Sequence, residues 1–130
     1  MEKQYSKDAP ELVIYDATIS HGSGDKPTII INKTGAITVN RQTIIDMGLR
    51  EGDKIIFAKD KKRPRDWYIK TGNSGFKLRY SASKSMIFSC KPLANIILSS
   101  IESSKTREVI PVSNQPNANG WHALITANVR

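Results

Sequence analysis

The chain has 130 residues, of which 38% are hydrophobic and 25% are charged, a composition typical of a soluble globular protein. This length predicts one domain, or two small halves that share one core. No stretch approaches the ~20 apolar residues of a membrane span, and the first residues lack the apolar segment of a signal peptide, so we expect no membrane association. The single cysteine, Cys90, cannot form an internal disulfide, which favours a reducing, cytoplasmic setting.

The formal net charge of +8 is concentrated in the middle of the chain. Residues 1–53 have six Lys or Arg and eight Asp or Glu, a net charge of −2. Residues 54–91 have eleven Lys or Arg and two acids, a net charge of +9, and residues 92–130 add +1. One basic block is what a polyanion-binding surface requires. The alternative interpretation is a solvated, lysine-rich face that keeps the protein soluble.

The first part of the chain is predicted to be a tail followed by two strands. Residues 1–11 are polar and of mixed charge, as a flexible tail would be. Residues 12–19 predict a first strand, and a loop composition follows over residues 21–27. Thr28–Asn32 predicts a second strand, buried on both faces because its centre is apolar throughout.

The next stretch predicts a strand, a short helix, a tight turn and another strand. Ala36–Val39 alternates and is rich in β-branched residues, as a half-buried strand is. Asn40 stands where a helix N-cap is expected, and Gly48 is placed to end the helix with a positive φ. A Glu-Gly-Asp turn at 51–53 then leads into the strand Lys54–Phe57.

This stretch resembles the AbrB/SpoVT-type swapped-hairpin DNA-binding proteins from Thr34 to about Ile69. Two positions depart from the family pattern: Ala36 stands where a basic residue is frequent, and Asn40 replaces the usual proline. The resemblance implies a small β-barrel and a role as a transcriptional regulator or an antitoxin-like partner. The residues that match the pattern without gaps are Gly35, Gly48, Leu49, Glu51, Gly52 and Asp53.

After Phe57 the sequence predicts a polar loop over residues 58–66, a strand over 66–70 and a turn over 71–75. In the strand predicted over 76–80, apolar and basic residues alternate, so one set faces the core and the other faces outward. The expected core-facing residues are Phe76, Leu78 and Tyr80. The expected outward-facing residues are Lys77 and Arg79.

A second, fainter unit has the same order of elements. We expect a strand over 85–89, a helix opened by Lys91 and Pro92, a strand over 106–112, and a last strand over 121–126. A tryptophan follows the long loop of each unit, at positions 67 and 121. This recurrence suggests an internal duplication in which one chain imitates a homodimer.

The predicted fold is therefore mixed and β-rich (α+β): a small closed β-barrel of about eight strands with two short helices, AbrB-like or double-psi-like. It would be a single domain over residues 12–130, built from two strand-helix-strand-strand units at about 28–80 and about 85–126. The expected oligomeric state is a monomeric pseudo-dimer or a homodimer.

The candidate nucleic-acid-binding residues belong mainly to the basic block, where Lys and Arg side chains can neutralise phosphates and release counterions. Pro64 would stiffen the loop that holds five of them. Lys77, Arg79 and Lys84 would extend the same face, and Arg41 lies at the helix start beside the family's contact region. Trp67 and Tyr68 are candidates for base stacking, with alternation placing one of them in the core. The complete basic set is Arg41, Lys59, Lys61, Lys62, Arg63, Arg65, Lys77, Arg79 and Lys84.

These features predict a regulatory or architectural protein that binds nucleic acid, DNA rather than RNA, mainly through phosphate contacts. The alternative is a structural or assembly module of a phage or mobile element, in which the basic block binds an acidic protein partner. We expect no enzymatic activity, no cofactor and no metal, because His21, Cys90 and His122 lack the spacing of metal ligands or of a catalytic pair.

Overall fold

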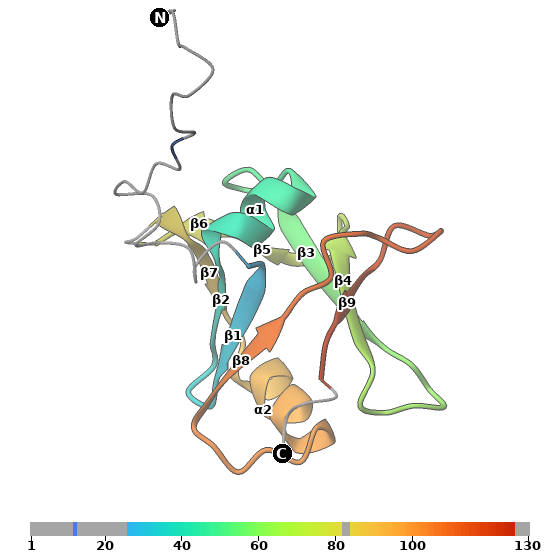
Figure 1. Cartoon of the computed structure of the whole chain (residues 1–130). Helices are drawn as coiled ribbons and strands as arrows, with labels where there is room; N and C mark the ends of the chain where they lie inside the picture. The colour runs from blue at the N-terminus through green and yellow to red at the C-terminus, as the bar shows by residue number, and fades with distance from the viewer. Residues whose placement is uncertain (1–11, 13–25, 82–83, 127–130) are drawn as a thin grey trace, which may run out of the picture.

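The computed structural model describes residue 12 and residues 26–81 and 84–126, which form two antiparallel sheets and two helices (Figure 1). The predicted tail over 1–11 lies outside the described residues. So do the predicted strand over 12–19, apart from the exposed Leu12, and most of the loop over 21–27. No helix among the described residues is long and apolar enough to cross a membrane.

The first sheet has five strands in the order β6-β7-β2-β1-β8, and the second has four in the order β5-β3-β4-β9. The two helices lie at opposite ends of the sheets (Figure 1). The strands of the first sheet are β1 (Thr28–Asn32), β2 (Ala36–Val39), β6 (Arg79–Tyr80), β7 (Met86–Ser89) and β8 (Arg107–Pro111). Those of the second are β3 (Lys54–Lys59), β4 (Trp67–Thr71), β5 (Phe76–Lys77) and β9 (His122–Leu124). The helices are α1 (Arg41–Met47) and α2 (Lys91–Ser100).

The mixed β-rich prediction is confirmed, but no closed barrel is found among the described residues. The prediction that β1 is buried on both faces was wrong. Ile29 and Ile31 are fully buried, whereas Ile30 is only partly covered on the outer face. Ile30 pairs there with Thr38 of β2 and Val109 of β8, and Val109 is 45% exposed.

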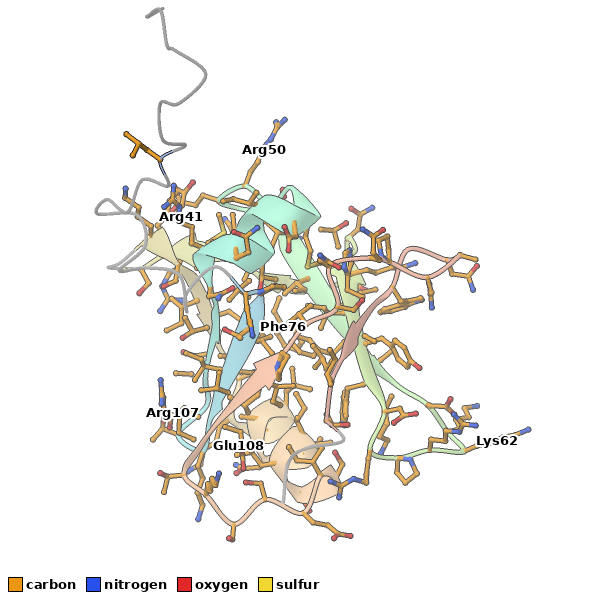
Figure 2. The ribbon with its side chains drawn as sticks, in the orientation of Figure 1. Arg41, Arg50, Lys62, Phe76, Arg107 and Glu108 are labelled. Atoms are coloured by element: carbon orange, nitrogen blue, oxygen red, sulfur yellow. The ribbon has the colours of Figure 1, made fainter. Side chains whose placement is uncertain are left out.

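The core lies between the two sheets, where three phenylalanine rings meet. The rings of Phe76 and Phe88 stack with centroids 4.8 Å apart, and Phe57 contacts both of them at 6.3 and 5.9 Å. Phe57 and Phe76 belong to the second sheet and Phe88 to the first. The cluster therefore joins the two layers, and Figure 2 shows Phe76 at the centre of the molecule.

The strand predicted over 76–80 is broken at Leu78, which is fully buried, so that β5 belongs to one sheet and β6 to the other. The turn after α1 forms backbone hydrogen bonds with the chain at this break. Gly52 N–H donates to Leu78 O at 2.9 Å, and Leu78 N–H donates to Asp53 O at 2.9 Å. Tyr80 pairs with the fully buried Met86 and so lies on the inner face, but on the edge strand β6 it is 57% exposed and does not join the core.

The opposite edges of the two sheets are also joined by backbone hydrogen bonds. Ser113 N–H donates to Ala123 O at 2.8 Å, and Ile125 N–H donates to Pro111 O at 2.8 Å. An isolated antiparallel bridge between Val112 and Leu124 lies between these bonds. Each sheet is thus connected to the other at both of its edges.

The two predicted units have the same element order, β2-α1-β3-β4 and β7-α2-β8-β9. Strands that hold the same place in each unit pair with each other, β2 with β7 and β4 with β9. The other two pairs also match each other: β8, the strand after α2, pairs with β1, and β3, the strand after α1, pairs with β5. In the last of these pairs, Lys54 and Lys77 lie directly opposite each other.

Asn40 ties α1 to β1 through a set of hydrogen bonds. Its Oδ1 accepts from Thr43 N–H at 3.0 Å, as the predicted N-cap does, and also from Thr28 N–H at 3.0 Å. The hydroxyl of the fully buried Thr43 donates to the same oxygen at 2.7 Å. Asn40 Nδ2 donates to Lys26 O at 2.7 Å. At the other end of the helix, Gly48 adopts the predicted left-handed conformation with φ 65°.

We expect Asn40→Ala to lower the free energy of unfolding by about 2 kcal/mol, the upper end for loss of an N-cap, because Thr28 N–H also loses its acceptor while the Thr43 hydroxyl can still donate to Thr28 O. Asn40→Asp is the matched control: it keeps the acceptor oxygens and loses only the Nδ2 donor. Urea unfolding of the wild type and the two variants measures their order of stability. Equal stability of the wild type and the alanine variant would contradict this role.

Gly75 is required by close backbone contact rather than by its φ. A Cβ at this position would overlap the backbone of Ile55, including its nitrogen at 2.8 Å. We expect Gly75→Ala to cost about 3 kcal/mol, since backbone cannot move aside as a side chain can. Gly48→Ala has open space around its Cβ and would incur only the left-handed penalty of about 1 kcal/mol. Thermal unfolding of both variants tests the difference, and similar losses would argue against the Ile55 contact.

Candidate nucleic-acid interface

The basic loop, defined here as residues 59–66, leaves the end of β3 and returns to β4. Its backbone is closed by hydrogen bonds from Asp60 N–H to Asp66 O at 3.0 Å and from Asp66 N–H to Arg63 O at 2.8 Å. The Asp60 carboxylate turns inward and accepts from Lys62 N–H at 2.8 Å. Thr126 Oγ1, near the end of the described chain, donates to Arg65 O at 2.8 Å. The loop is therefore an ordered platform, and its first acid, Asp60, is used to hold the loop backbone in place.

Three of the five cations of the basic loop point away from this platform. Lys61, Lys62 and Arg63 are exposed, and their side chains form no ion pair with any described residue. Figure 2 shows Lys62 extending outward from the rest of the molecule. Arg65 lies nearer the body, with Nη1 3.9 Å from the carboxylate of Glu102 in the residues after α2. Five cations and two acids give the loop a net charge of +3.

The remaining predicted basic residues form a second group near α1 instead of extending the loop's face. Arg41 and Lys84 line a pocket of about 470 Å³ together with Tyr80. Lys77 and Arg79 line another, of about 600 Å³. Figure 2 shows Arg41 and Lys62 at opposite ends of the molecule. The structure thus divides the nine predicted residues into two separate positive surfaces.

The base-stacking prediction was wrong for Trp67. Its side chain is 5% exposed, and its indole N–H donates to Ser100 Oγ of α2 at 2.7 Å. Its ring is covered further by Lys59, whose Nζ lies 5.8 Å from the centroid. Alternation along β4 turns Tyr68 to the outer face, where it is partly exposed.

Sequence analysis missed Trp121 as a site residue. His122 and Leu124 of β9 face the core, so the preceding Trp121 faces outward, on the opposite side of the sheet from Trp67. The two tryptophans that suggested a recurring landmark are therefore not structurally equivalent. Trp121 and Tyr68 line a pocket of about 280 Å³ beside the start of the basic loop. Its outward position is encoded by the alternation of His122 and Leu124.

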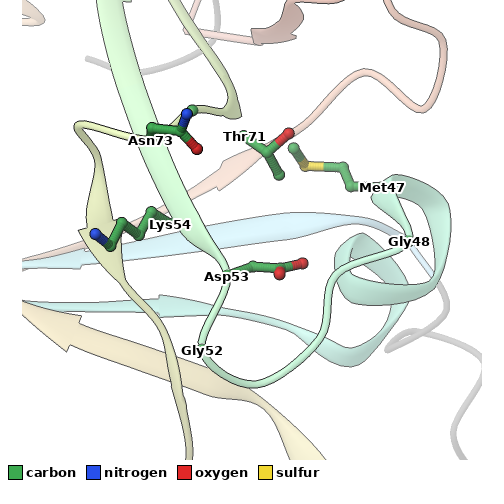
Figure 3. A pocket seen from close by; sticks show the side chains of 8 residues that line it. Met47, Gly48, Gly52, Asp53, Lys54, Thr71 and Asn73 are labelled. Atoms are coloured by element: carbon green, nitrogen blue, oxygen red, sulfur yellow. The ribbon is translucent and has the colours of Figure 1, made fainter.

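A further pocket, of about 670 Å³, lies at the other end of β3 (Figure 3). It is bordered by the end of α1, the turn after it and the turn between β4 and β5. Its one carboxylate, that of Asp53, accepts from Arg50 N–H at 2.9 Å and so stabilises the turn. No group of three His, Cys, Asp or Glu residues that could hold a metal ion is found within the described part of the chain.

The residues that match the AbrB/SpoVT pattern have structural roles in this chain. Gly48 ends α1, Leu49 is 6% exposed, and Gly52 has φ 95° in the turn that bonds to Leu78. Glu51 Oε2 accepts from Tyr80 N–H at 3.1 Å. The matching residues therefore help to join the sheets, and the basic loop lies outside the turn that they form. Comparisons with protein-family models, with curated proteins and with solved structures gave no match for this chain.

Proposed function

We propose that this protein binds nucleic acid through the basic loop, and that the nucleic acid is DNA, as the AbrB/SpoVT resemblance implies. The observation that supports this proposal is the concentration of five cations in eight residues, on a loop closed by its own backbone hydrogen bonds. A preformed loop loses little conformational entropy on binding. The exposed side chains of Lys61, Lys62 and Arg63 can displace the counterions condensed on phosphates.

The contacts would be made mainly to the phosphate backbone. A protein that specifies sequence places side chains such as Asn, Gln or Arg against base edges, usually from a helix in the major groove. Helix α1 has only seven residues, and its Gln42 side chain donates to Asp46 Oδ1 at 2.8 Å. The exposed cations of the basic loop lie instead on the connection between β3 and β4, from which they can contact phosphates. This favours an architectural or broadly binding regulatory protein.

We also propose that the two units arose by internal duplication and together form one barrel, with a single chain in the place of a homodimer. The pairing of β2 with β7 and of β4 with β9 supports this, because a twofold relation between the units places like strands beside each other. The hydrogen bonds that join the sheets at both edges support the barrel. A monomer by light scattering is the expected result, and an obligate interlocked dimer would argue against the duplication.

The surface near α1 supports a second candidate function, binding of an acidic protein partner as an assembly module. Ile45 and Tyr80 are each 57% exposed there, and they line one pocket with Arg41 and Lys84. Exposed apolar side chains flanked by cations suit a partner surface of mixed apolar and acidic character. Because this surface and the basic loop are far apart, variants can test the two functions separately.

We expect the triple variant Lys61→Ala/Lys62→Ala/Arg63→Ala to bind a labelled DNA duplex more weakly than the wild type. Affinity falls as salt rises, and each lost phosphate contact reduces the magnitude of the slope of log affinity against log salt by about 0.9. The triple variant is therefore expected to show a slope that is shallower by about 2 to 3. Fluorescence anisotropy over a salt series measures both quantities.

The matched control is Arg41→Ala/Lys77→Ala/Lys84→Ala, which removes three charges from the other positive surface and is expected to leave binding nearly unchanged. A loss of affinity confined to this control would place the interface near α1 instead. No binding by the wild type at low salt would refute nucleic-acid binding and leave the acidic-partner function as the better candidate.

A further inference from the structure

A small aromatic pocket adjoins the basic loop on the outer face of the second sheet. It has a volume of about 280 Å³, close to the lower end of the roughly 300–1,000 Å³ of small-molecule sites. Its walls are the rings of Tyr68 and Trp121, and its rim includes the first two residues of the basic loop. The lining residues are Ala58, Lys59, Asp60, Tyr68, Asn117 and Trp121.

The register of the sheet leaves the Tyr68 ring accessible. Tyr68 pairs with Ala58 of β3 on one side and with Ala123 of β9 on the other. Side chains directly opposite each other in a sheet normally cover one another. Alanine side chains are too small to do so here, and a hollow remains above the tyrosine.

Trp121 is held in place by the turn that precedes it. Asn117 Oδ1 accepts from Trp121 N–H at 3.0 Å and from Asn119 N–H at 2.9 Å, while Asn117 N–H donates to Trp121 O at 2.8 Å. Lys70 Nζ lies 4.6 Å from the centroid of the indole ring and 3.4 Å from Asn119 O. These contacts fix the backbone of Trp121 and place the Lys70 ammonium over its ring, while the indole stays partly exposed.

The chemistry of the pocket matches that of a nucleobase. Aromatic side chains at the surface stack on bases of any sequence, because every base has a π-face. The side-chain oxygen of Asn117 is occupied by two backbone donors, so its amide nitrogen is left to donate to the edge of a base. The Lys59 ammonium is turned to the other face, over Trp67, so the positive charge beside the pocket comes from the exposed Lys61, Lys62 and Arg63 of the basic loop.

We propose that this pocket receives an unstacked base of single-stranded nucleic acid whose phosphates lie along the basic loop. In a duplex the faces of the bases are covered by their neighbours, so only a single strand or a flipped base can enter. The inference rests on the proposed function and makes it more specific: it assigns single-stranded nucleic acid as the preferred ligand class, with Tyr68 and Trp121 as the stacking residues.

The test compares binding of a labelled thymidine oligonucleotide and of a duplex of mixed sequence to the wild type and to Trp121→Ala and Tyr68→Ala. Loss of one base–aromatic stack is expected to weaken single-strand binding about 5-fold to 150-fold, with little change for the duplex. Val109→Ala, which shortens an exposed apolar side chain on the outer face of the first sheet, is the control and is expected to bind like the wild type. Far-UV circular dichroism verifies that each variant is folded.

Three results would count against the inference, and they differ in what else they overturn. Equal affinity of the wild type for both ligands, or unchanged single-strand affinity in the folded Trp121→Ala and Tyr68→Ala variants, would refute the stacking pocket while leaving the basic loop as a phosphate site. Absence of binding to either ligand would refute the proposed function as well.

Discussion

The two sheets depend on a reciprocal pair of backbone hydrogen bonds between the turn after α1 and the chain at Leu78. Gly52 N–H donates to Leu78 O, and Leu78 N–H donates to Asp53 O, both at 2.9 Å. Leu78 is fully buried, so leaving either its N–H or its C=O group unpaired would cost the protein about 1–3 kcal/mol of stability. The division of 76–80 between the sheets follows from this pairing, as does the stacking of Phe76 on Phe88 across the interior.

This junction and the candidate interface lie at opposite ends of the same strand. β3 begins beside the turn and ends at the basic loop, and it is held between β5 and β4 along the way. The return strand is fixed at its first residue, because Trp67 is buried and bonded to Ser100 of α2. The loop is thus supported on both sides by the core while its own side chains contribute little to it. Changes in the loop's charge are therefore separable from changes in the fold.

Local signals in the sequence predicted most of the elements, and the failures occurred where distant segments decide the outcome. Asn40 and Gly48 were predictable because capping depends on neighbouring residues alone. The exposure of Tyr80 was not, since regular alternation gives no sign that the strand changes sheets where the 51–53 turn binds it. The same holds for the site. The basic loop is visible in the charge pattern, whereas the meeting of Tyr68 with Trp121 depends on the β4–β9 register, which joins segments more than 50 residues apart.

The facing lysines of β3 and β5, taken with the proposed phosphate binding, imply two opposite responses to ionic strength. Lys54 and Lys77 lie directly across from each other on exposed positions, and like charges in that geometry repel. Screening by salt acts over about 8 Å at physiological ionic strength and relieves this repulsion. The same screening would weaken the proposed attraction of the basic loop for phosphates. Conditions that release a polyanion from one end of β3 would thus tighten the seam between strands at its other end.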